Sequence, residues 1–388
     1  MHKLPTAWLQ LRYQKVRLIA ALFGVVFAVV IVFMQLGIRD ALFDSSIRLH
    51  QSLRGDCFII SPRSTSSIAM QTFSQRRLFQ TLAFKEVEFV SPIYQAFGQW
   101  RNPENRSYWR NLNMIGIDLR QNILELPGID EGLELLKQSD TVLFDSSARE
   151  EFGPIAENFL NNGEVVTEIR NGDATRKIKV VGLFKLGTSF GFDGNLVMSH
   201  LNFLRIVENR QEGFINIGLI KLKADADPEM FKQKLQEYLP NDVIVFTKKE
   251  FMNFEKSYWK SSTAIGFIFN LGVFLGIVVG VVVVYQILYT NVAEHLPQYA
   301  TLKAIGYKNQ YLLKLVIQQA FLIAVLGYIP GLLIAIIQYE VVKKATLLPV
   351  IMTLNRAGFV LIATIIMCAI AGSTAVKKLQ DADPADIF

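Results

Sequence analysis

Four uninterrupted apolar runs divide the chain, one near its start and three in its second half. The runs are 18–38, 264–290, 315–339 and 357–376, and none of them contains Asp, Glu, Lys or Arg. A bilayer core about 30 Å thick is crossed by roughly 20 helical residues at a rise of about 1.5 Å each. A charge at the centre of a span would cost about 2.5–3.5 kcal/mol, which explains why charges are missing. The pattern predicts an α-helical membrane protein with four transmembrane helices, one followed by three.

The stretch between the first two runs, residues 39–263, alternates between apolar and polar positions in short segments. Alternation with a period of two is typical of strands that are buried on one face. Asn171-Gly172 separates two such segments and favours a hairpin, because Gly readily adopts a positive φ. The predicted strands are Val87–Trp100, Ser107–Asp118, Gly163–Arg170, Thr175–Phe184, Ile215–Lys223 and Val243–Phe246.

Helices are predicted at both ends of this stretch and once inside it. Arg39–Arg54 is expected to extend the helix of the first apolar run. Asp227 followed by Pro228 favours a helix start, because Asp caps the first turn and Pro fits within it. The capping box Thr247–Glu250 opens another helix, which is expected to run almost continuously into the second apolar run. The sequence therefore predicts a large mixed α/β extracytoplasmic domain on two helical stalks.

Basic residues indicate the orientation in the membrane. They are more frequent before the first run, between the second and third and after the last than between the third and fourth, and short cytoplasmic segments carry an excess of Lys and Arg. We expect cytoplasmic segments at 1–17, 291–314 and 377–388, and periplasmic segments at 39–263 and 340–356. The first run exceeds a signal-peptide core of roughly 7–15 residues, so we expect it to remain as an anchor.

The composition fits a membrane protein with a substantial aqueous part, since 51% of the residues are hydrophobic and 19% are charged. The net charge of +6 is spread along the chain without a run of Lys and Arg, which favours membrane-flanking charge over nucleic-acid binding. Cys57 lies in the aqueous stretch and Cys368 in the last apolar run, so no disulfide is expected.

Glycines in the apolar runs predict close helix packing. Gly272, Gly276 and Gly280 recur every four residues on one face of the second run, and such a stripe lets two helix backbones approach each other in lipid. The partner helix can belong to the same chain or to a second copy. The segment Gly327–Gly331, which contains Pro330, predicts a kink in the third run.

The sequence offers little catalytic chemistry. It has no GxxxxGK[ST] motif, and its four histidines are dispersed without the spacing of metal ligands. Gly187–Gly191 matches GxSxG, but the nucleophile elbow of a hydrolase requires a helix after Ser189, and Phe192–Asn195 breaks any helix there. We therefore expect no catalytic, cofactor or metal site, and a transport subunit that is not itself an enzyme.

A family resemblance lies between the second and third runs. Glu294–Tyr307 resembles the cytoplasmic element of MacB/FtsX-type ABC permeases, where a run similar to R-E-I-G-x-x-x-A-x-G-A stands at the same place. Ala304 and Gly306 match the second half of that run, whereas its usual Arg, Glu and Gly are replaced by Pro297, Gln298 and Ala300.

Two further segments extend the resemblance. The tail 383–388 is similar to the closing Pro-x-x-Ala-Leu element of the family, and Leu186–Leu196 is most similar to the cyanobacterial DevC-type permeases. The resemblance implies a permease in the bacterial inner membrane that transmits ATPase movement to its periplasmic domain and exports a glycolipid or similar amphipathic substrate. The residues it assigns to ATPase docking are Pro297, Gln298, Lys303, Ala304 and Gly306.

The same resemblance implies the partners: a cytoplasmic ABC ATPase subunit, a second copy of the permease, a periplasmic adaptor and an outer-membrane channel of TolC type. Three alternatives stay open. The chain can be a lipoprotein-releasing permease, an FtsX-like regulator of a periplasmic hydrolase, or a membrane-anchored enzyme whose only support is the pattern around Ser189.

Overall fold

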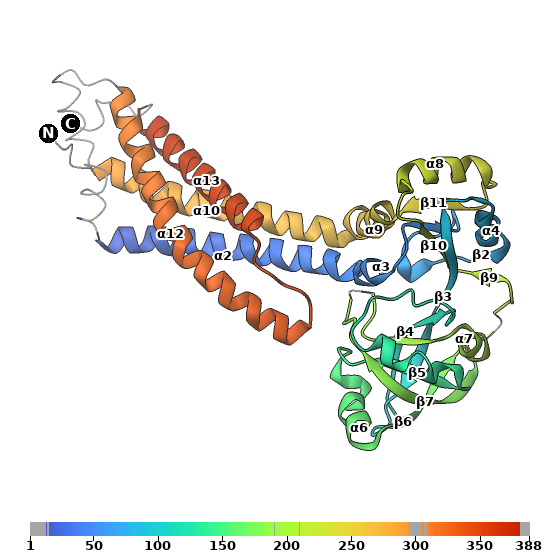
Figure 1. Cartoon of the computed structure of the whole chain (residues 1–388). Coiled ribbons are helices and arrows are strands. Elements are labelled where there is room, and N and C mark those ends of the chain that lie inside the picture. Colours follow the sequence, from blue (N-terminus) through green and yellow to red (C-terminus); the bar gives the residue numbers. More distant parts are fainter. Residues whose placement is uncertain are drawn as a thin grey trace. The chain divides into compact units, whose positions relative to one another are not determined.

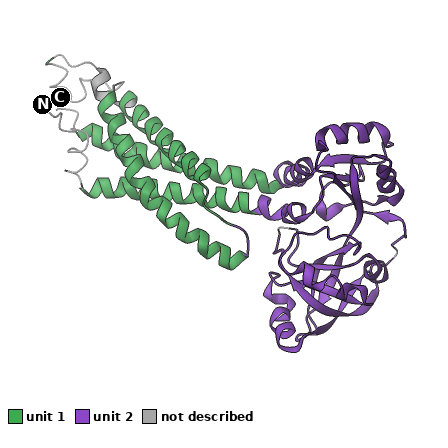
Figure 2. Ribbon diagram, in the orientation of Figure 1, with its two compact units in different colours: residues 1–41, 264–346, 350–388 green, residues 42–263, 347–349 purple. Residues whose placement is uncertain are grey.

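The computed structural model describes residues 15–189, 191–208, 210–294 and 309–380, together with Tyr13 and Ile305. The chain forms two compact units (Figure 2). The first unit comprises residues 1–41, 264–346 and 350–388, and the second comprises residues 42–263 and 347–349.

The first unit is built from four long helices (Figure 1). Each helix contains one of the predicted apolar runs and is long and apolar enough to cross a membrane. The third of these helices continues through Pro330 without a break. Their bounds are α2 Lys15–Ser46, α10 Ala264–Glu294, α12 Asn309–Thr346 and α13 Leu354–Gln380.

The second unit contains a mixed sheet of nine strands in the order β11-β1-β10-β3-β4-β8-β5-β7-β6. An additional pairing of β3 with β6 closes the last six strands into a barrel. A separate two-stranded sheet joins β2, Phe73–Ser74, to β9, Phe214–Ile215. The nine strands are β1 Cys57–Ile60, β3 Val87–Arg101, β4 Trp109–Ile117, β5 Thr141–Asp145, β6 Val165–Asn171, β7 Ala174–Phe184, β8 Asn195–Ser199, β10 Ile217–Leu222 and β11 Ile244–Thr247.

The predicted strands and hairpin are present. All six predicted segments overlap observed strands, and the pairing of β6 with β7 ends at Asn171 and Ala174, where Gly172 has a φ of 63°. Only the segment predicted at 215–223 is divided, because Asn216 separates β9 from β10. Alternation along the strands therefore located most of the sheet.

Short helices pack against the strands of the sheet. The helix predicted after Asp227 begins at Pro228, and the Asp227 side chain accepts hydrogen bonds from the backbone N–H groups of Glu229 and Met230. The capping box of Thr247 and Glu250 is also formed. The helices are α3 Arg48–Ser52, α4 Gln75–Gln80, α5 Ile129–Gly132, α6 Ile155–Asn162, α7 His200–Ile206, α8 Pro228–Tyr238 and α9 Lys248–Ser257, with short turns η1 Ser67–Ala69, η2 Thr81–Ala83, η3 Leu135–Lys137, η4 Glu150–Phe152 and the π-helical η5 Tyr258–Ser262.

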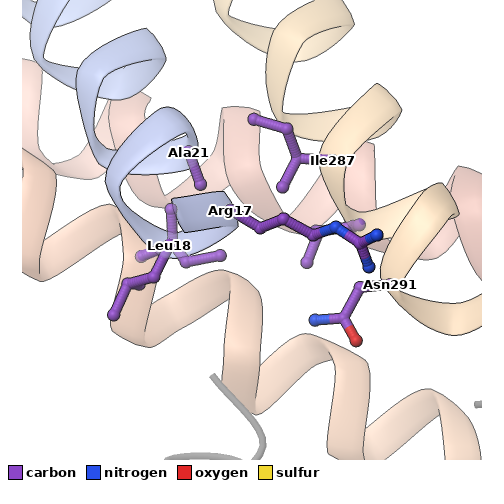
Figure 3. Close-up of a pocket in the computed structure, with 7 residues that line it drawn as sticks. Arg17, Leu18, Ala21, Ile287 and Asn291 are labelled. Atoms are coloured by element: carbon purple, nitrogen blue, oxygen red, sulfur yellow. The ribbon is translucent and has the colours of Figure 1, made fainter. Parts of the chain in front are cut away.

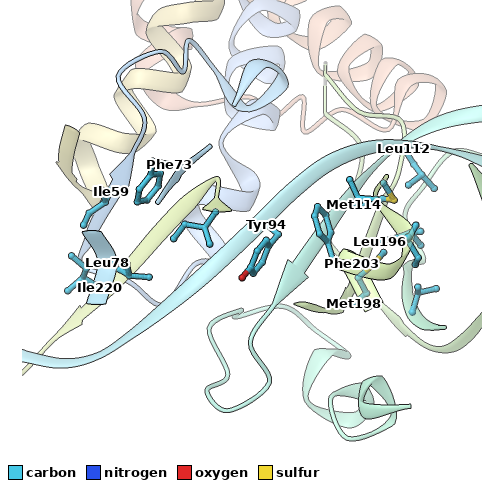
Figure 4. Packing of buried hydrophobic residues seen from close by; sticks show 14 of the residues in the cluster. Ile59, Phe73, Leu78, Tyr94, Leu112, Met114, Leu196, Met198, Phe203 and Ile220 are labelled. Atoms are coloured by element: carbon cyan, nitrogen blue, oxygen red, sulfur yellow. The ribbon is translucent and has the colours of Figure 1, made fainter. Parts of the chain in front are cut away.

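Two apolar clusters form on the opposite faces of the sheet. Along β4, Leu112 and Met114 belong to one cluster, which Figure 4 shows with Leu196 of β8 and Phe203 of α7. Ile115 belongs to the other cluster, which also contains residues of α3 and α9. The alternation of β4 between the clusters explains why its last six residues are all buried.

The helix predicted to run almost continuously from Thr247 into the second apolar run is interrupted at one residue, Thr263. After α9 the chain makes the π-helical turn η5, and Thr263 is extended, with φ −121° and ψ 156°. The hydroxyls of Ser261 and Thr263 donate to the carbonyls of Ser257 and Trp259. Such bonds from side chains to the backbone compete with helix propagation, and π-helical turns interrupt the regular ladder.

Candidate coupling site

The predicted ATPase-docking residues lie outside the described residues. Docking therefore stays a prediction, and the tail 383–388 has the same status. The residues concerned are Pro297, Gln298, Lys303, Ala304 and Gly306.

The glycine stripe of α10 faces other helices of the same chain. A Cβ added at Gly276 would lie 3.1 Å from side-chain carbons of Ile31 and Val32 on α2. One added at Gly280 would lie 2.9 Å from Ala28 of α2 and would also collide with α13. The stripe therefore allows close backbone approach within one chain, which the sequence left undecided.

The third long helix uses glycine in the same way. Added Cβ atoms at Gly327 and Gly331 of α12 would lie 2.6 and 2.7 Å from Val25 and Val29 of α2. In the reverse sense, Gly24 of α2 leaves room for a valine of α10. Helix α2 thus packs against both α10 and α12, as α13 also does. One face of α2, which includes Val25, Val29 and Phe33, is almost fully buried.

A partly buried ion pair joins α2 to α13. The Arg356 guanidinium, whose side chain is 8% exposed, donates to the Asp40 carboxylate with an Nη2–Oδ2 distance of 2.8 Å. Its Nη1 donates to the carbonyl of Ile351 at 2.7 Å, and its Cζ lies 5.7 Å from the centre of the Tyr339 ring. A charge that loses water needs this degree of compensation from hydrogen bonds.

Neighbouring bonds connect this ion pair to the remaining two helices. Arg39 donates to Asp40 and also to the side chain of Asn270 on α10, at 2.9 Å. The Tyr339 hydroxyl on α12 donates to the carbonyl of Phe33 at 2.5 Å. All four long helices are therefore joined through polar groups within the first unit.

The other end of α2 also carries a polar contact with α10. Arg17 forms an exposed ion pair with Glu294. Figure 3 shows Arg17 reaching toward Asn291, beside a cavity of about 10 Å³ that Ala21 and Ile287 also line. A space of this size holds about one water molecule, so it is a packing defect rather than a ligand pocket.

In the second unit, a buried carboxylate holds η1 against α9. Glu255 is 1% exposed and accepts hydrogen bonds from the Ser67 N–H at 2.7 Å, the Ser67 hydroxyl at 2.9 Å and the Trp259 indole at 2.8 Å. Burial raises the pKa of the Glu255 carboxyl, and these hydrogen bonds act in the opposite direction. The cluster links α9, η5 and η1.

His50 of α3 packs against the same cluster. Its Nε2 lies 3.4 Å from the Ser67 hydroxyl, and its ring centre lies 4.4 Å from that of Phe251 on α9. Burial lowers the pKa of His50 to about 4, because a charged imidazole would lose its hydration there. At neutral pH the residue is therefore an uncharged packing element between α3 and α9.

Five buried polar side chains lie on adjacent segments of the sheet, from the start of β10 across β3, β4 and β8 to β5. None is more than 5% exposed. The Asn216 side chain accepts from the Gln95 N–H at 2.8 Å, and the Gln95 side chain donates to Asn113 at 3.0 Å. Asn113 donates to Asn195 at 3.2 Å, and Asn195 donates to Asp145 at 2.8 Å. We call these residues the polar row.

The polar row ends at the loop after β7. Asp145 accepts hydrogen bonds from the N–H groups of Leu186 and Gly187 at 3.2 and 2.9 Å. Arg48 of α3 donates to the carbonyls of Leu186 and Thr188 at 3.4 and 3.3 Å. Burial lowers the pKa of Arg48, and the negative charge of Asp145 opposes that shift. The loop is thus held between the stalk helix α3 and the barrel.

The GxSxG pattern lies in this loop. The Ser189 hydroxyl accepts a hydrogen bond from the Phe192 N–H at 3.2 Å, and the Ser189 N–H donates to the Phe192 carbonyl at 2.9 Å, so Ser189 is engaged by its own loop. Strand β8 follows at the place where a nucleophile elbow would begin a helix.

Two family models match this chain, and together they cover most of both units. Residues 18–238, more than half of the chain, match the family described as MacB-like periplasmic core domain. Residues 270–384 match the family described as FtsX-like permease C-terminal. The chain belongs to the MacB/FtsX family of ABC transporter permeases.

Two solved structures are similar to this permease. The periplasmic region of MacB from Actinobacillus actinomycetemcomitans is 13% identical, with a TM-score of 0.37 over 52% of this chain and 92% of that one. The extracellular domain of the noncanonic ABC-type transporter YknZ from Gram-positive bacteria is 11% identical, with a TM-score of 0.34 over 50% of this chain and 99% of that one. A comparison with curated proteins gave no match.

The sequence analysis missed the polar contacts of the permease. Asp40 and Arg356 each border an apolar run, and opposite charges at matching ends of two spans were a signal for their pairing. The polar row had a weaker signal, because Gln95, Asn113 and Asn195 interrupt otherwise apolar strands. Only the strand order shows that they are neighbours.

We predict that Gly276→Leu destabilises the first unit by about 1–3 kcal/mol, because the new side chain overpacks the contact with α2. The thermal unfolding midpoint of the detergent-solubilised permease measures the loss. Gly358→Leu is the matched control, since nothing lies within 4 Å of a Cβ added at Gly358. Equal midpoints for the two variants would contradict packing of the stripe on α2.

We predict that Arg356→Leu lowers the free energy of unfolding by about 1.5–3 kcal/mol, because Asp40 and the Ile351 carbonyl lose a charged donor. Unfolding in detergent measures the difference. Lys343→Leu serves as control, because it removes an exposed ion pair of little expected stability. The Lys343 Nζ lies 3.8 Å from Glu340 Oε1, and half of the lysine side chain is exposed. A loss as large in the control as in Arg356→Leu would show that the ion pair contributes nothing specific.

We predict that His50 makes the permease less stable in acid. Its pKa falls from 6.5 to about 4 on folding, so the unfolded chain binds a proton first and stability declines as the pH falls from 6.5 toward 4. Glu255, with its raised pKa, acts in the opposite direction. The decline amounts to about 3 kcal/mol at most. His50→Gln should flatten the dependence of the unfolding midpoint on pH, and an unchanged slope would refute the assignment.

Proposed function

We propose that this permease is the membrane subunit of an ATP-driven export system of MacB type, in which ATPase movement is transmitted through the long helices to the α/β unit. Membership of the family implies a separate ATPase subunit and a second copy of the permease. The chain has no P-loop, so the energy comes from that ATPase partner.

The observation that carries this proposal is the position of α2 in the packing. In the first unit, glycine contacts join α2 to α10 and α12, and the Asp40 ion pair joins it to α13. The helix continues to Ser46, and α3 follows in the second unit. There Arg48 donates to the loop after β7, and His50 packs beside Ser67 of η1. A displacement of α2 would therefore be passed along one covalent backbone.

We place both termini in the cytoplasm and the α/β unit in the periplasm of a bacterial cell. The excess of basic residues in the segments 1–17, 291–314 and 377–388 supports this orientation. The family match of residues 18–238 to a periplasmic core domain supports it further.

The substrate in this proposal is a glycolipid or similar amphipathic molecule, delivered to a periplasmic adaptor and an outer-membrane channel of TolC type. Its support is the resemblance of the Leu186–Leu196 segment to DevC-type permeases. The apolar runs of the four helices carry no charged residue, so they are poorly suited to line an aqueous channel. Export from the periplasmic side or the outer leaflet fits this composition.

The deciding experiment replaces Gly306 in the predicted docking segment. Gly306→Trp should abolish co-purification of the ATPase or uncouple ATP hydrolysis from export. The bulky ring would push the ATPase surface away from a segment that is predicted to lie close to it. Gly358→Trp provides a matched control, because nothing lies within 4 Å of a Cβ added at Gly358. A cysteine placed at Asn171 should still be labelled from outside intact cells in both variants. Wild-type ATPase binding and export in Gly306→Trp would refute the docking assignment.

A further inference from the structure

A cleft of about 420 Å³ opens on the outer face of the barrel, where β3 lies next to β4 and β6. Figure 1 shows these strands in the same part of the second unit. Trp100 and Leu112 belong to the inner cluster, so the alternating positions Gln99 and Asn111 lie on the outer face. The cleft is lined by Phe97, Gln99, Asn111, Arg170, Asn171 and Asp173.

The cleft results from the short seam that closes the barrel. Strands β3 and β6 pair at only two positions, Gln99 with Arg170 and Trp100 with Ile169. Next to the seam the Asn171 side chain donates to the Phe97 carbonyl at 2.7 Å, in place of a further ladder bond.

Glu208 fixes the hairpin wall of the cleft. Its backbone N–H donates to the Asn171 side chain at 3.0 Å, and its carboxylate accepts from the Asp173 N–H at 3.0 Å. The β6–β7 turn, which forms one side of the cleft, is thus held at both of its flanking residues. The cleft therefore has its shape without a ligand.

Neutral amides dominate the chemistry of this cleft. Gln99 stands between Asn111 on β4 and Arg170 on β6, so the three side chains form a line across three strands. Arg170 donates to the Gln99 side-chain oxygen at 2.9 Å and lies 4.7 Å from the centre of the Trp109 ring. Among the residues that the structure describes, none makes a hydrogen bond with the Asn111 amide or the Gln99 amino group.

We propose that the cleft binds the uncharged, hydroxyl-rich ring of a saccharide. A hydroxyl group both donates and accepts hydrogen bonds, and the amide of Asn111 offers one group of each kind. Phe97 is 38% exposed, and its ring centre lies 5.4 Å from that of Phe192. Its ring supplies an apolar surface for the C–H face of a sugar. The volume lies within the range of small-molecule sites, about 300–1,000 Å³.

Two other classes of ligand fit this cleft less well. An anion would gain little, because Arg170 already donates to Gln99 and Asp173 supplies an opposing charge. A polypeptide that adds a strand needs an unpaired strand edge, whereas β3 is paired at Gln99 with β4 on one side and β6 on the other. The saccharide therefore remains the occupant that the free groups match.

The test uses the purified full-length permease in micelles of a sugar-free, zwitterionic detergent. Maltose is titrated in one arm and a small fraction of dodecyl maltoside in the other, and saturation-transfer NMR follows the sugar protons. We expect binding to the wild type and an affinity loss of about tenfold in Asn111→Leu. Gln99→Leu should cause a similar loss. Asn241→Leu, at another exposed Asn of the same unit, should bind like the wild type.

Tighter binding of the glycoside than of maltose would identify a lipid headgroup as the source, and equal binding would identify a soluble sugar; both outcomes support the site. Absence of saccharide binding, binding that survives both cleft substitutions, or displacement of maltose by inorganic phosphate would overturn it. Only the lipid origin of the sugar rests on the proposed export function. That function is tested separately by ATPase co-purification, so the two can fail independently.

Discussion

Close helix–helix approach at glycine positions is the constraint on which the helical unit depends. Lipid gives no hydrophobic driving force for helix association, so contact area and backbone proximity must supply it. Gly276 and Gly280 on α10 and Gly327 and Gly331 on α12 provide that proximity, because each leaves the space that a neighbouring side chain fills. Helix α2, against which they pack, continues through Ser46 into the second unit.

In each unit one buried charged side chain is satisfied by several hydrogen bonds. Arg356 and Asp40 compensate each other at one end of the helices, and Glu255 accepts three hydrogen bonds beside α9. Buried polar networks of this kind favour one arrangement strongly, because a lost partner leaves an unsatisfied group in a medium of low dielectric constant. Under the proposed function, they suit a protein whose parts move as rigid bodies.

In the second unit a series of contacts leads from α3 to β3, the strand that also carries part of the proposed saccharide cleft. Arg48 holds the loop at Gly187, Asp145 binds the same loop, and the polar row leads from Asp145 to Gln95. Gln95 and Gln99 lie four residues apart on β3, on the same face. Under the proposed function, a movement of α3 would displace β3 close to the cleft where we propose that the saccharide binds.

Local patterns in the sequence determined the elements of this protein. The apolar runs located the four long helices, alternation located the strands, and Asp227 and Thr247 marked helix starts, because each of these signals depends on neighbours in the chain. The break at Thr263, by contrast, had no stop signal that the sequence analysis recognised. The packing partner of the glycine stripe, the Asp40–Arg356 pair, the polar row and the cleft were decided only by the tertiary structure. Their members are far apart in the chain, and only the packing of helices and the strand order bring them into contact.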